Sequence, residues 1–510
     1  MLSRKLAMKR AATQPVLTLL LLALCVPNTW AQTPSDQNTG GAPPAATGLD
    51  TTTQMSENPP LSGLDQPSFE PGFGTRSYLA PRVELSESLD SNSLGNFSKG
   101  NYEESTRALG SLELQKLWKL HPLDVDYIGG VDWYNRANGG VYQVHSLAAI
   151  QRFLWRTGQL AVRDSFSYLP EGSFGFGSFG GAGAFGAGGL GGQGLGGVSG
   201  GIFSNSSYGV IGTQVSNMTV VDATQYLSPR SSVVVTGGYG FTDFLSTPKT
   251  SFCPVNTNCY FNSQQAIGQV AYNHQISRHD QIAFVYAYEQ LHFPGTSAGS
   301  LNVNLWQIEY GHRISGKLDF LIGGGPEWIH RSQPEEELLT IPTGLPCLNT
   351  GGLLTCVNVK SAFLTGSAQV SLRYRASALT NFSVSYLRFV SSGSGFFGGA
   401  KTDTARLSVN HALGRQWNIL LDTGYTHNSA LLSTTSTAAG VATSYNDWYF
   451  GGGAHRRLGR HFAVFGSYQY NAFAFSSGGC NASGSNCGAS YGRNILLIGL
   501  NWIPQPIRLD

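Results

Sequence analysis

The sequence predicts an all-β protein, a transmembrane antiparallel up-and-down β-barrel of about 16 strands. Three observations favour this fold. Apolar and polar residues alternate with a period of two over segments of about ten residues, and the connections between segments alternate between short and long. Charged residues make up 12% of the chain and aromatic residues 11%, with 65 glycines, a composition typical of a barrel that faces lipid. A large secreted sandwich or propeller would explain the alternation, but not the unequal connections.

Residues 1–31 have the features of a secretory signal peptide. A start with four basic residues precedes the apolar core Val16–Val26, which is shorter than the roughly 18–20 residues that a spanning helix needs. Small Ala31 precedes Gln32, so we expect Sec-type export and cleavage there. Removing these four positive charges changes the net charge from +2 to −2, which leaves no basic surplus for binding nucleic acid.

The segment 32–122 is predicted to be a flexible periplasmic linker. Its first part, to about residue 70, is rich in Pro, Ser, Thr, Gly and Gln and lacks apolar periodicity. The stretch Leu109–Leu120 (LGSLELQKLWKL) fits either a short helix or an extra strand, and the sequence leaves both open. We expect the barrel over 123–503 and a C-terminal tail over 504–510.

The clearest predicted strand places Ile282, Phe284, Tyr286 and Tyr288 on one face and smaller residues on the other. Counting back from the last strand, which ends at Trp502, gives about 16 strands and a first strand near Leu123–Tyr134. An even number lets the first and last strands close antiparallel. One added strand near Leu109 would break this parity unless another joined it.

The connections orient the barrel, because membrane barrels have tight periplasmic turns and long outer loops. The short turns are RTGQ, SPRS, SRHD, SGK, ASAL, GR and LGR, and the long loops lie near 170–215, 245–262, 294–299, 331–357, 392–400, 429–442 and 476–489. Aromatic residues beside the short turns are predicted to form an interfacial girdle. They are Trp155, Tyr226, Tyr374, Trp417, Phe462 and Trp502.

One residue opposes the predicted register. If Leu160, Val162 and Phe166 face lipid, then Asp164 faces it too, at a cost of about a few kcal/mol. A bulge or a contact with another protomer would relieve this cost.

Six cysteines remain after export, and they fall in the long loops. An even number in an exported chain favours disulfides. We predict that each cysteine pairs with its neighbour in the sequence: Cys253 with Cys259, Cys347 with Cys356, and Cys480 with Cys487.

The sequence contains no convincing catalytic, metal or cofactor motif. The GxGxxG matches are not followed by a helix, and GTSAG (Gly295–Gly299) lies at a hairpin tip instead of a strand-to-helix turn. The 11 histidines lack metal-ligand spacing, and no motif supports a catalytic role for Asp422 or His411. We therefore expect no enzyme, no metal and no cofactor.

The loop 170–215 combines glycine with Phe174, Phe176, Phe179 and Phe185. It could constrict the lumen, adhere to surfaces or remain in solvent, and the sequence leaves these alternatives open.

With the apolar residues facing outward, the opposite positions carry both signs of charge. The predicted lumen-lining residues are Arg163, Glu309, Arg313, Arg373, Arg375, Arg406 and Asp422. A polar lining of this kind suits a water-filled channel for small hydrophilic solutes. The alternatives are a plugged structural or surface-binding barrel that acts through its disulfide-tied outer loops and, less favoured, an outer-membrane hydrolase.

The plan of strands and loops, ending in ILLIGLNW, resembles bacterial outer-membrane β-barrel proteins of the porin kind over about 123–502. The segment Leu64–Asn92 is similar to the stretch before the barrel in a group of such proteins. This resemblance implies contact with outer-membrane lipid, insertion by the barrel-assembly machinery and passive solute diffusion, with a homotrimer as one assembly. IPQPIRLD after Trp502, and the position of Gly499, depart from the usual terminal pattern.

Overall fold

The computed structural model describes residues 77–92, 102–135, 140–169, 213–246, 261–294, 299–337, 355–377, 379–393, 397–413, 416–431, 443–476 and 490–509. Every regular element in these ranges is a β-strand. No helix among the described residues is long and apolar enough to cross a membrane.

Eighteen consecutive strands form the barrel wall, each hydrogen-bonded to the next in the chain. They are β1 (Tyr78–Asp90), β2 (Glu103–Lys116), β3 (Leu123–Tyr134), β4 (Val141–Trp155), β5 (Gly158–Leu169), β6 (Thr213–Ser228), β7 (Ser231–Ser246), β8 (Ser263–Gln275), β9 (Asp280–His292), β10 (Ser300–Ser315), β11 (Leu318–Glu337), β12 (Thr355–Ser377), β13 (Thr380–Ser391), β14 (Ala400–Leu413), β15 (Trp417–Ala430), β16 (Ser444–Leu458), β17 (Phe462–Phe475) and β18 (Ser490–Trp502). A two-residue strand, β19 (Ile507–Arg508), follows them.

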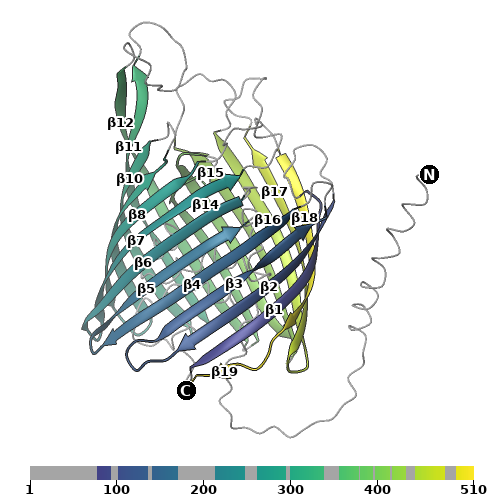
Figure 1. Ribbon diagram of the computed structural model, residues 1–510. Helices are drawn as coiled ribbons and strands as arrows, with labels where there is room; N and C mark the ends of the chain where they lie inside the picture. The colour runs from purple at the N-terminus through teal and green to yellow at the C-terminus, as the bar shows by residue number, and fades with distance from the viewer. Residues whose placement is uncertain are drawn as a thin grey trace, which may run out of the picture. The chain divides into compact units, whose positions relative to one another are not determined.

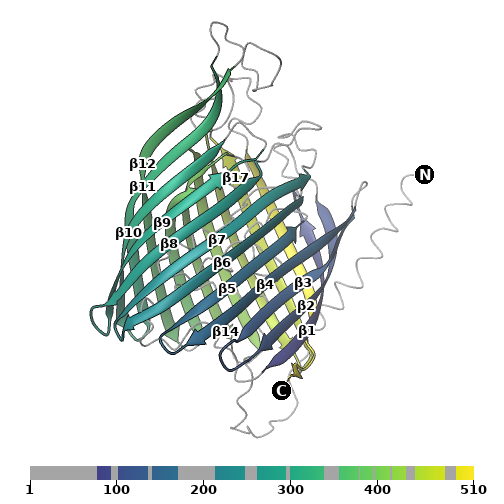
Figure 2. The ribbon, with the colours of Figure 1, turned by 60° about the vertical axis from the view of Figure 1, so that its left-hand side comes forward.

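The sheet closes on itself, because β1 pairs with β18 from Val83↔Trp502 to Asp90↔Ile495. All pairings are antiparallel, and the tilted strands encircle one interior (Figures 1 and 2). Closure leaves no unpaired edge, which is the condition for a sheet that meets hydrocarbon. The predicted fold class, an all-β antiparallel up-and-down barrel, is confirmed.

The strand count is 18 instead of about 16, because β1 and β2 belong to the wall. Both lie inside the segment 32–122, for which the sequence predicts a linker, so the barrel begins at Tyr78 instead of 123. Of the two alternatives for Leu109–Leu120, the structure has a strand that ends at Lys116. The two added strands preserve the even parity. The predicted tail also takes part, since β19 pairs with Tyr78 and Leu79.

The two faces of the wall differ in chemistry. Large apolar side chains occupy one face and are exposed, for example Phe284 (48%), Trp306 (53%) and Ile308 (55%). Their neighbours along the same strands are buried and include Glu309 and Gln307. The fully uncovered face of a closed barrel is its outer face, so the apolar set faces outward and the polar set inward.

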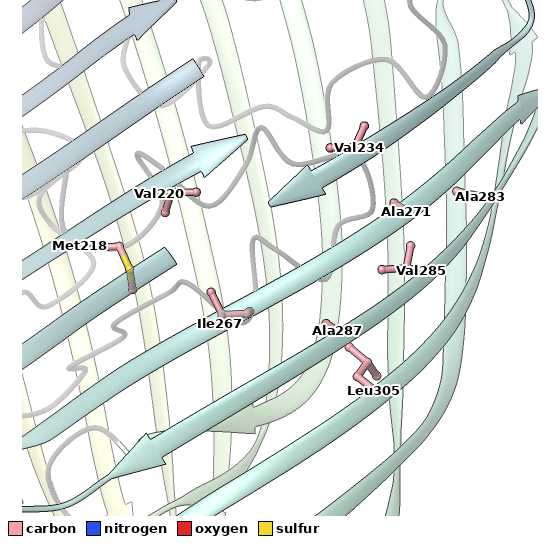
Figure 3. Close-up of a cluster of buried hydrophobic side chains, with 9 residues drawn as sticks. All are labelled: Met218, Val220, Val234, Ile267, Ala271, Ala283, Val285, Ala287 and Leu305. Atoms are coloured by element: carbon pink, nitrogen blue, oxygen red, sulfur yellow. The ribbon is translucent and has the colours of Figure 1, made fainter. Parts of the chain in front are cut away.

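One apolar cluster lies on the inner face, across five adjacent strands from β6 to β10 (Figure 3). Its members are mostly small, with alanines on β8 and β9 beside Val285 and Leu305. This side of the wall is therefore packed with methyl groups, whereas most inward charges lie on other strands.

Strand β11 contains Pro326 in the interior of the sheet, where proline is normally excluded because it has no N–H to donate. The pairing of β11 with β10 is interrupted there, between Leu305↔Glu327 and Ile308↔Gly324. Gly325 lies so close to β10 that an added Cβ would collide with the carbonyl oxygen of Trp306. A glycine and a proline together thus accommodate a local irregularity in an otherwise regular ladder.

Candidate functional site: the inner face of the barrel

All seven residues predicted to line the lumen lie on the inward side of their strands. The register shows this directly, because cross-strand partners share a face: Arg163 pairs with Val220, Glu309 with Ala283, and Asp422 with Ser408. Arg313 and Arg406 follow by alternation on β10 and β14. Arg373 shares their face because it pairs with Asp319, which pairs with Arg313, and Arg375 follows two residues later on β12. The structure does not gather them at one point; it distributes them over β5, β10, β12, β14 and β15.

Arg163 on β5 forms an ion pair with Asp222 on β6, a residue that the sequence analysis did not single out. The side chains of Arg163 and Asp222 are 5% and 8% exposed. The Thr236 hydroxyl on β7 donates a 2.8 Å hydrogen bond to the other carboxylate oxygen. Three adjacent strands are thus linked across the inner face by one buried charge network.

A second network joins two of the predicted residues. Arg406 on β14 forms an ion pair with Asp422 on β15, and the Tyr449 hydroxyl on β16 donates to Asp422 at 2.8 Å. The carboxylate is buried while the guanidinium remains partly exposed. The Asp422 carboxylate therefore accepts hydrogen bonds from β14 and β16 and links these strands to β15.

A third group lies near the short turns of β10–β13. The Arg313 guanidinium donates to Asp319 at 3.0 Å, and Arg375 approaches the other carboxylate oxygen at 3.8 Å. Both contacts are partly exposed. Two arginines share one carboxylate, so this group keeps a net positive charge.

Glu309 is fully buried and lies over a glycine on the neighbouring strand. A Cβ built at Gly323 would lie 2.8 Å from the Glu309 Cγ, so the absence of a side chain at Gly323 makes room for the glutamate.

Further inward ion pairs were missed by the sequence analysis. Arg493 on β18 pairs with Asp90 on β1 across the closure, Arg107 pairs with Asp132 at 2.8 Å, and Arg82 pairs with Glu113 at 3.3 Å. Four of these six residues lie on β1 and β2, inside the segment that the sequence predicts as a linker. No local sequence signal connects Asp90 with Arg493, because the two are 403 residues apart.

The inward charges near the short turns are separated by sign. On β1–β4, four carboxylates (Glu84, Glu113, Asp124 and Asp126) stand with two guanidinium groups (Arg82 and Arg152), a net charge of −2. On β10–β12, three arginines (Arg313, Arg373 and Arg375) stand with one carboxylate (Asp319), a net charge of +2. Strands β3 and β12 are nine places apart in a ring of 18, so these two walls face each other across the interior.

The inner face is unevenly covered. Away from the short turns, most inward side chains on β8–β11 and β15–β17 are almost fully buried, including Gln269 (2%), Glu309 (0%) and Asn471 (1%). On β3 and β12–β14, inward residues such as Asp126, Ser371 and Arg406 are partly exposed. The accessible part of the interior thus lies between the acidic and the basic wall.

The six predicted girdle aromatics lie beside the short turns and are exposed by 41–46%, apart from Trp417, which is partly buried. Five are on the outward side of their strands. Tyr226 differs, because it pairs with Ser232, on the face that carries Asp222 and Thr224. The outward Trp417 ring contacts the Arg456 guanidinium, whose carbon lies 5.2 Å from the ring centroid.

Asp164 faces outward, as the alternation predicts, and the pairing of β5 with its neighbours continues without a bulge. Its carboxylate accepts hydrogen bonds from the Thr219 hydroxyl at 2.5 Å and from the Asn217 amide at 3.2 Å. Two side chains of the adjacent strand therefore satisfy the charge within the chain itself.

Several predictions fall outside the described residues. These are the signal peptide, the linker to residue 76, the Gly-rich loop before Thr213, GTSAG apart from Gly299, and the thiols of Cys253, Cys259, Cys347, Cys356, Cys480 and Cys487. Within the described ranges, no group of three or more His, Cys, Asp and Glu side chains could hold a metal ion. His411 lies on the outer face and contacts the Thr380 hydroxyl at 2.8 Å.

No family model matches the chain, and no curated protein matches it. Solved structures that match include bacterial outer-membrane proteins. The ferric-catecholate import receptor Fiu of E. coli K12 in its open form is 9% identical, with 83% of this chain and 81% of Fiu covered and a TM-score of 0.39. OccAB3 of Acinetobacter baumannii is 8% identical, with 84% and 99% covered and a TM-score of 0.37. A loop-deletion mutant of OmpT, an outer membrane protein of Vibrio cholerae, is 12% identical, with 84% and 100% covered and a TM-score of 0.29.

Proposed function

We propose that this barrel spans an outer membrane and conducts small hydrophilic solutes by passive diffusion. The observation that carries the proposal is the inner face of the closed wall, where charged and polar side chains replace the apolar residues of the outer face. A polar lining can hydrate the interior and solvate ions at a low cost in free energy, while the apolar outer face contacts lipid. The proposed channel is not an enzyme and needs no cofactor.

The opposed acidic and basic walls suggest how a solute would pass. The electric field between the walls points from Arg373 and Arg375 toward Asp126 and its neighbours, and it orients a dipolar solute between them. Charges within the low-dielectric wall act more strongly than charges in bulk water. We therefore expect a weakly selective pore whose ion preference depends on both walls.

Conductance in planar lipid bilayers tests this function. The purified barrel should give ohmic steps, with a reversal potential in a KCl gradient that depends on the wall charges. The double variant Arg373→Gln/Arg375→Gln should shift the reversal potential toward cation preference. The variant Asp124→Asn/Asp126→Asn should shift it in the opposite direction.

A matched control comes from the outer face. Arg456→Gln removes a positive charge that stacks on Trp417 outside the interior, so it should leave the reversal potential unchanged. Equal shifts from the Arg373/Arg375 and Arg456 variants would contradict a path between the two walls.

A second candidate is a plugged barrel that serves a structural or surface-binding role. The near-complete burial of inward Gln269, Glu309 and Asn471 favours it, because an open water-filled pore would leave such side chains accessible. Silence of the wild-type protein in bilayers, with correct folding shown by heat-modifiable electrophoretic mobility, would favour this alternative. Insertion by the barrel-assembly machinery and assembly as a homotrimer remain predictions from the resemblance.

A further inference from the structure

The end of the barrel that carries the short turns has a concentration of positive charge. In the sequence, seven of its connections contain one Lys or Arg each, and none of the seven contains Asp or Glu. Arg415 lies outside the described residues, and the other six basic residues are described. This density is high for a chain with only 12% charged residues. The six residues, here called the basic collar, are Lys119, Arg156, Arg230, Arg278, Lys317 and Arg460.

The collar charges are exposed and uncompensated. All six residues are exposed, and within the described part of the chain none of them forms an ion pair. The Lys317 ammonium makes a long contact of 3.5 Å with the Ala376 carbonyl, near the end of β12. Asp280, the acidic residue closest to Arg278 in the chain, is instead engaged by Ser277, Tyr310 and His312.

The turns hold the collar in place. The hydroxyls of Ser228, Ser277 and Ser315 each accept a hydrogen bond from the backbone N–H two residues later, at 3.2, 3.0 and 3.2 Å. A serine that bonds its own turn in this way stabilises a compact loop. The basic side chains that follow are thus presented from constrained turns at the rim.

Each collar residue lies within three positions of an exposed large apolar side chain. The exposed fractions are 49% for Trp118, 44% for Trp155, 62% for Leu227, 53% for Ile276, 56% for Ile314 and 46% for Phe462. The charges therefore border the apolar outer belt directly. Aromatic and aliphatic side chains beside cations are typical of the level where acyl chains meet phosphate headgroups.

We propose that the basic collar binds the phosphodiester headgroups of anionic phospholipids in the leaflet on the short-turn side. This rests on the proposed membrane-spanning function. A lipid satisfies both halves of the pattern, because its phosphate meets the cation while its glycerol and acyl groups meet the neighbouring apolar side chain. A soluble polyanion would contact the cations alone and would leave the apolar side chains exposed.

The test uses the full-length protein reconstituted in nanodiscs of phosphatidylcholine containing phosphatidylglycerol as the minor lipid. Native mass spectrometry after extraction counts the retained lipids of each class. The wild type should be enriched in phosphatidylglycerol. A variant with Arg156→Gln, Arg230→Gln, Arg278→Gln, Lys317→Gln and Arg460→Gln should lose at least about tenfold of this enrichment, since each basic residue near the surface contributes to binding.

Two further variants separate charge from folding. Exchanging Arg for Lys at the same positions, and Lys317 for Arg, keeps every charge and should keep the enrichment. If the combined neutral variant does not fold, the single variants Arg156→Gln and Arg278→Gln should each reduce the enrichment and weaken its dependence on salt.

Equal enrichment in the neutral and wild-type proteins would overturn the proposal. Retention of added polyphosphate without any enrichment in phosphatidylglycerol would also overturn it, in favour of a soluble anionic partner. Bilayer conductance of the same neutral variant keeps this inference apart from the channel. If the neutral variant conducts normally but loses the enrichment, the collar binds lipid and the channel is unaffected. If the wild-type protein is silent in bilayers but keeps the enrichment, only the channel is contradicted.

Discussion

Breaking the ion pair between Arg163 and Asp222 should cost far more stability than breaking the pair between Arg313 and Asp319, although both join an arginine to an aspartate across adjacent strands. The decisive perturbation is Asp222→Ala, with Asp319→Ala as its counterpart. The first removes the carboxylate from a buried site, and the second removes it from a partly hydrated one.

The magnitude follows from the surroundings of each pair. The Arg163 and Asp222 side chains are 5% and 8% exposed, and Thr236 adds a hydrogen bond to the carboxylate. Without Asp222, the Arg163 guanidinium stays buried but loses this carboxylate as its counter-charge. Such a loss costs about 3–5 kcal/mol of unfolding free energy. The Arg313 and Asp319 side chains are 28% and 30% exposed, and loss of a contact at such exposure costs about 0.2–1 kcal/mol.

Reversible unfolding in urea, followed by tryptophan fluorescence in lipid vesicles, measures both free energies of unfolding. Replacing both partners with apolar residues, in Arg163→Met/Asp222→Leu, removes the stranded charge and should recover most of the stability lost in Asp222→Ala.

Equal losses for Asp222→Ala and Asp319→Ala would refute this reasoning. It would mean that water reaches the Arg163 site and that the charge is not desolvated there. A double variant as unstable as the single variant would show, instead, that packing of the side-chain volume matters more than the unpaired charge.

Three other predictions test the two faces and the loops. Ile308→Arg, on the lipid-facing side near the middle of β10, should cost about 2–4 kcal/mol of unfolding free energy in vesicles, whereas inward Ser371→Arg should cost much less. Gly325→Ala should destabilise the barrel by about 1–3 kcal/mol because its Cβ collides with the neighbouring strand, whereas Gly237→Ala, with nothing within 4 Å of the new methyl group, should be nearly neutral in the same assay. Alkylation of the unfolded, non-reduced protein should label none of the six mature-chain cysteines; complete labelling would exclude the predicted disulfides.

Much of the wall was predictable from local sequence, because one strand carries its own period of two. The alternation around Phe284 and Val285 predicted which side chains face outward, and the register agrees. The same reasoning placed Asp164 on the outer face correctly. It could not identify Thr219 and Asn217 as its hydrogen-bond donors, because the pairing of β5 with β6 spans a long loop.

Strands β1 and β2 were missed for a physical reason. Their inward positions carry charges such as Arg82, Glu84 and Arg107, and their outward positions include Glu87, so the contrast between the faces is weak. The outward Glu87 is accommodated by the Thr106 hydroxyl, which donates to it at 2.8 Å. Only the pairing of β1 with both β2 and β18 shows that these residues belong to the barrel.

The sequence by itself determined the fold class, the alternation of faces and the alternation of short and long connections, since each depends on residues close together in the chain. Tertiary structure decided the number of strands, the partner of each inward charge and the opposition of the acidic and basic walls. These depend on closure, in which Asp90 meets Arg493 and β3 comes to face β12. A period of two is a property of one strand, whereas the circumference that brings distant strands together is a property of the whole ring.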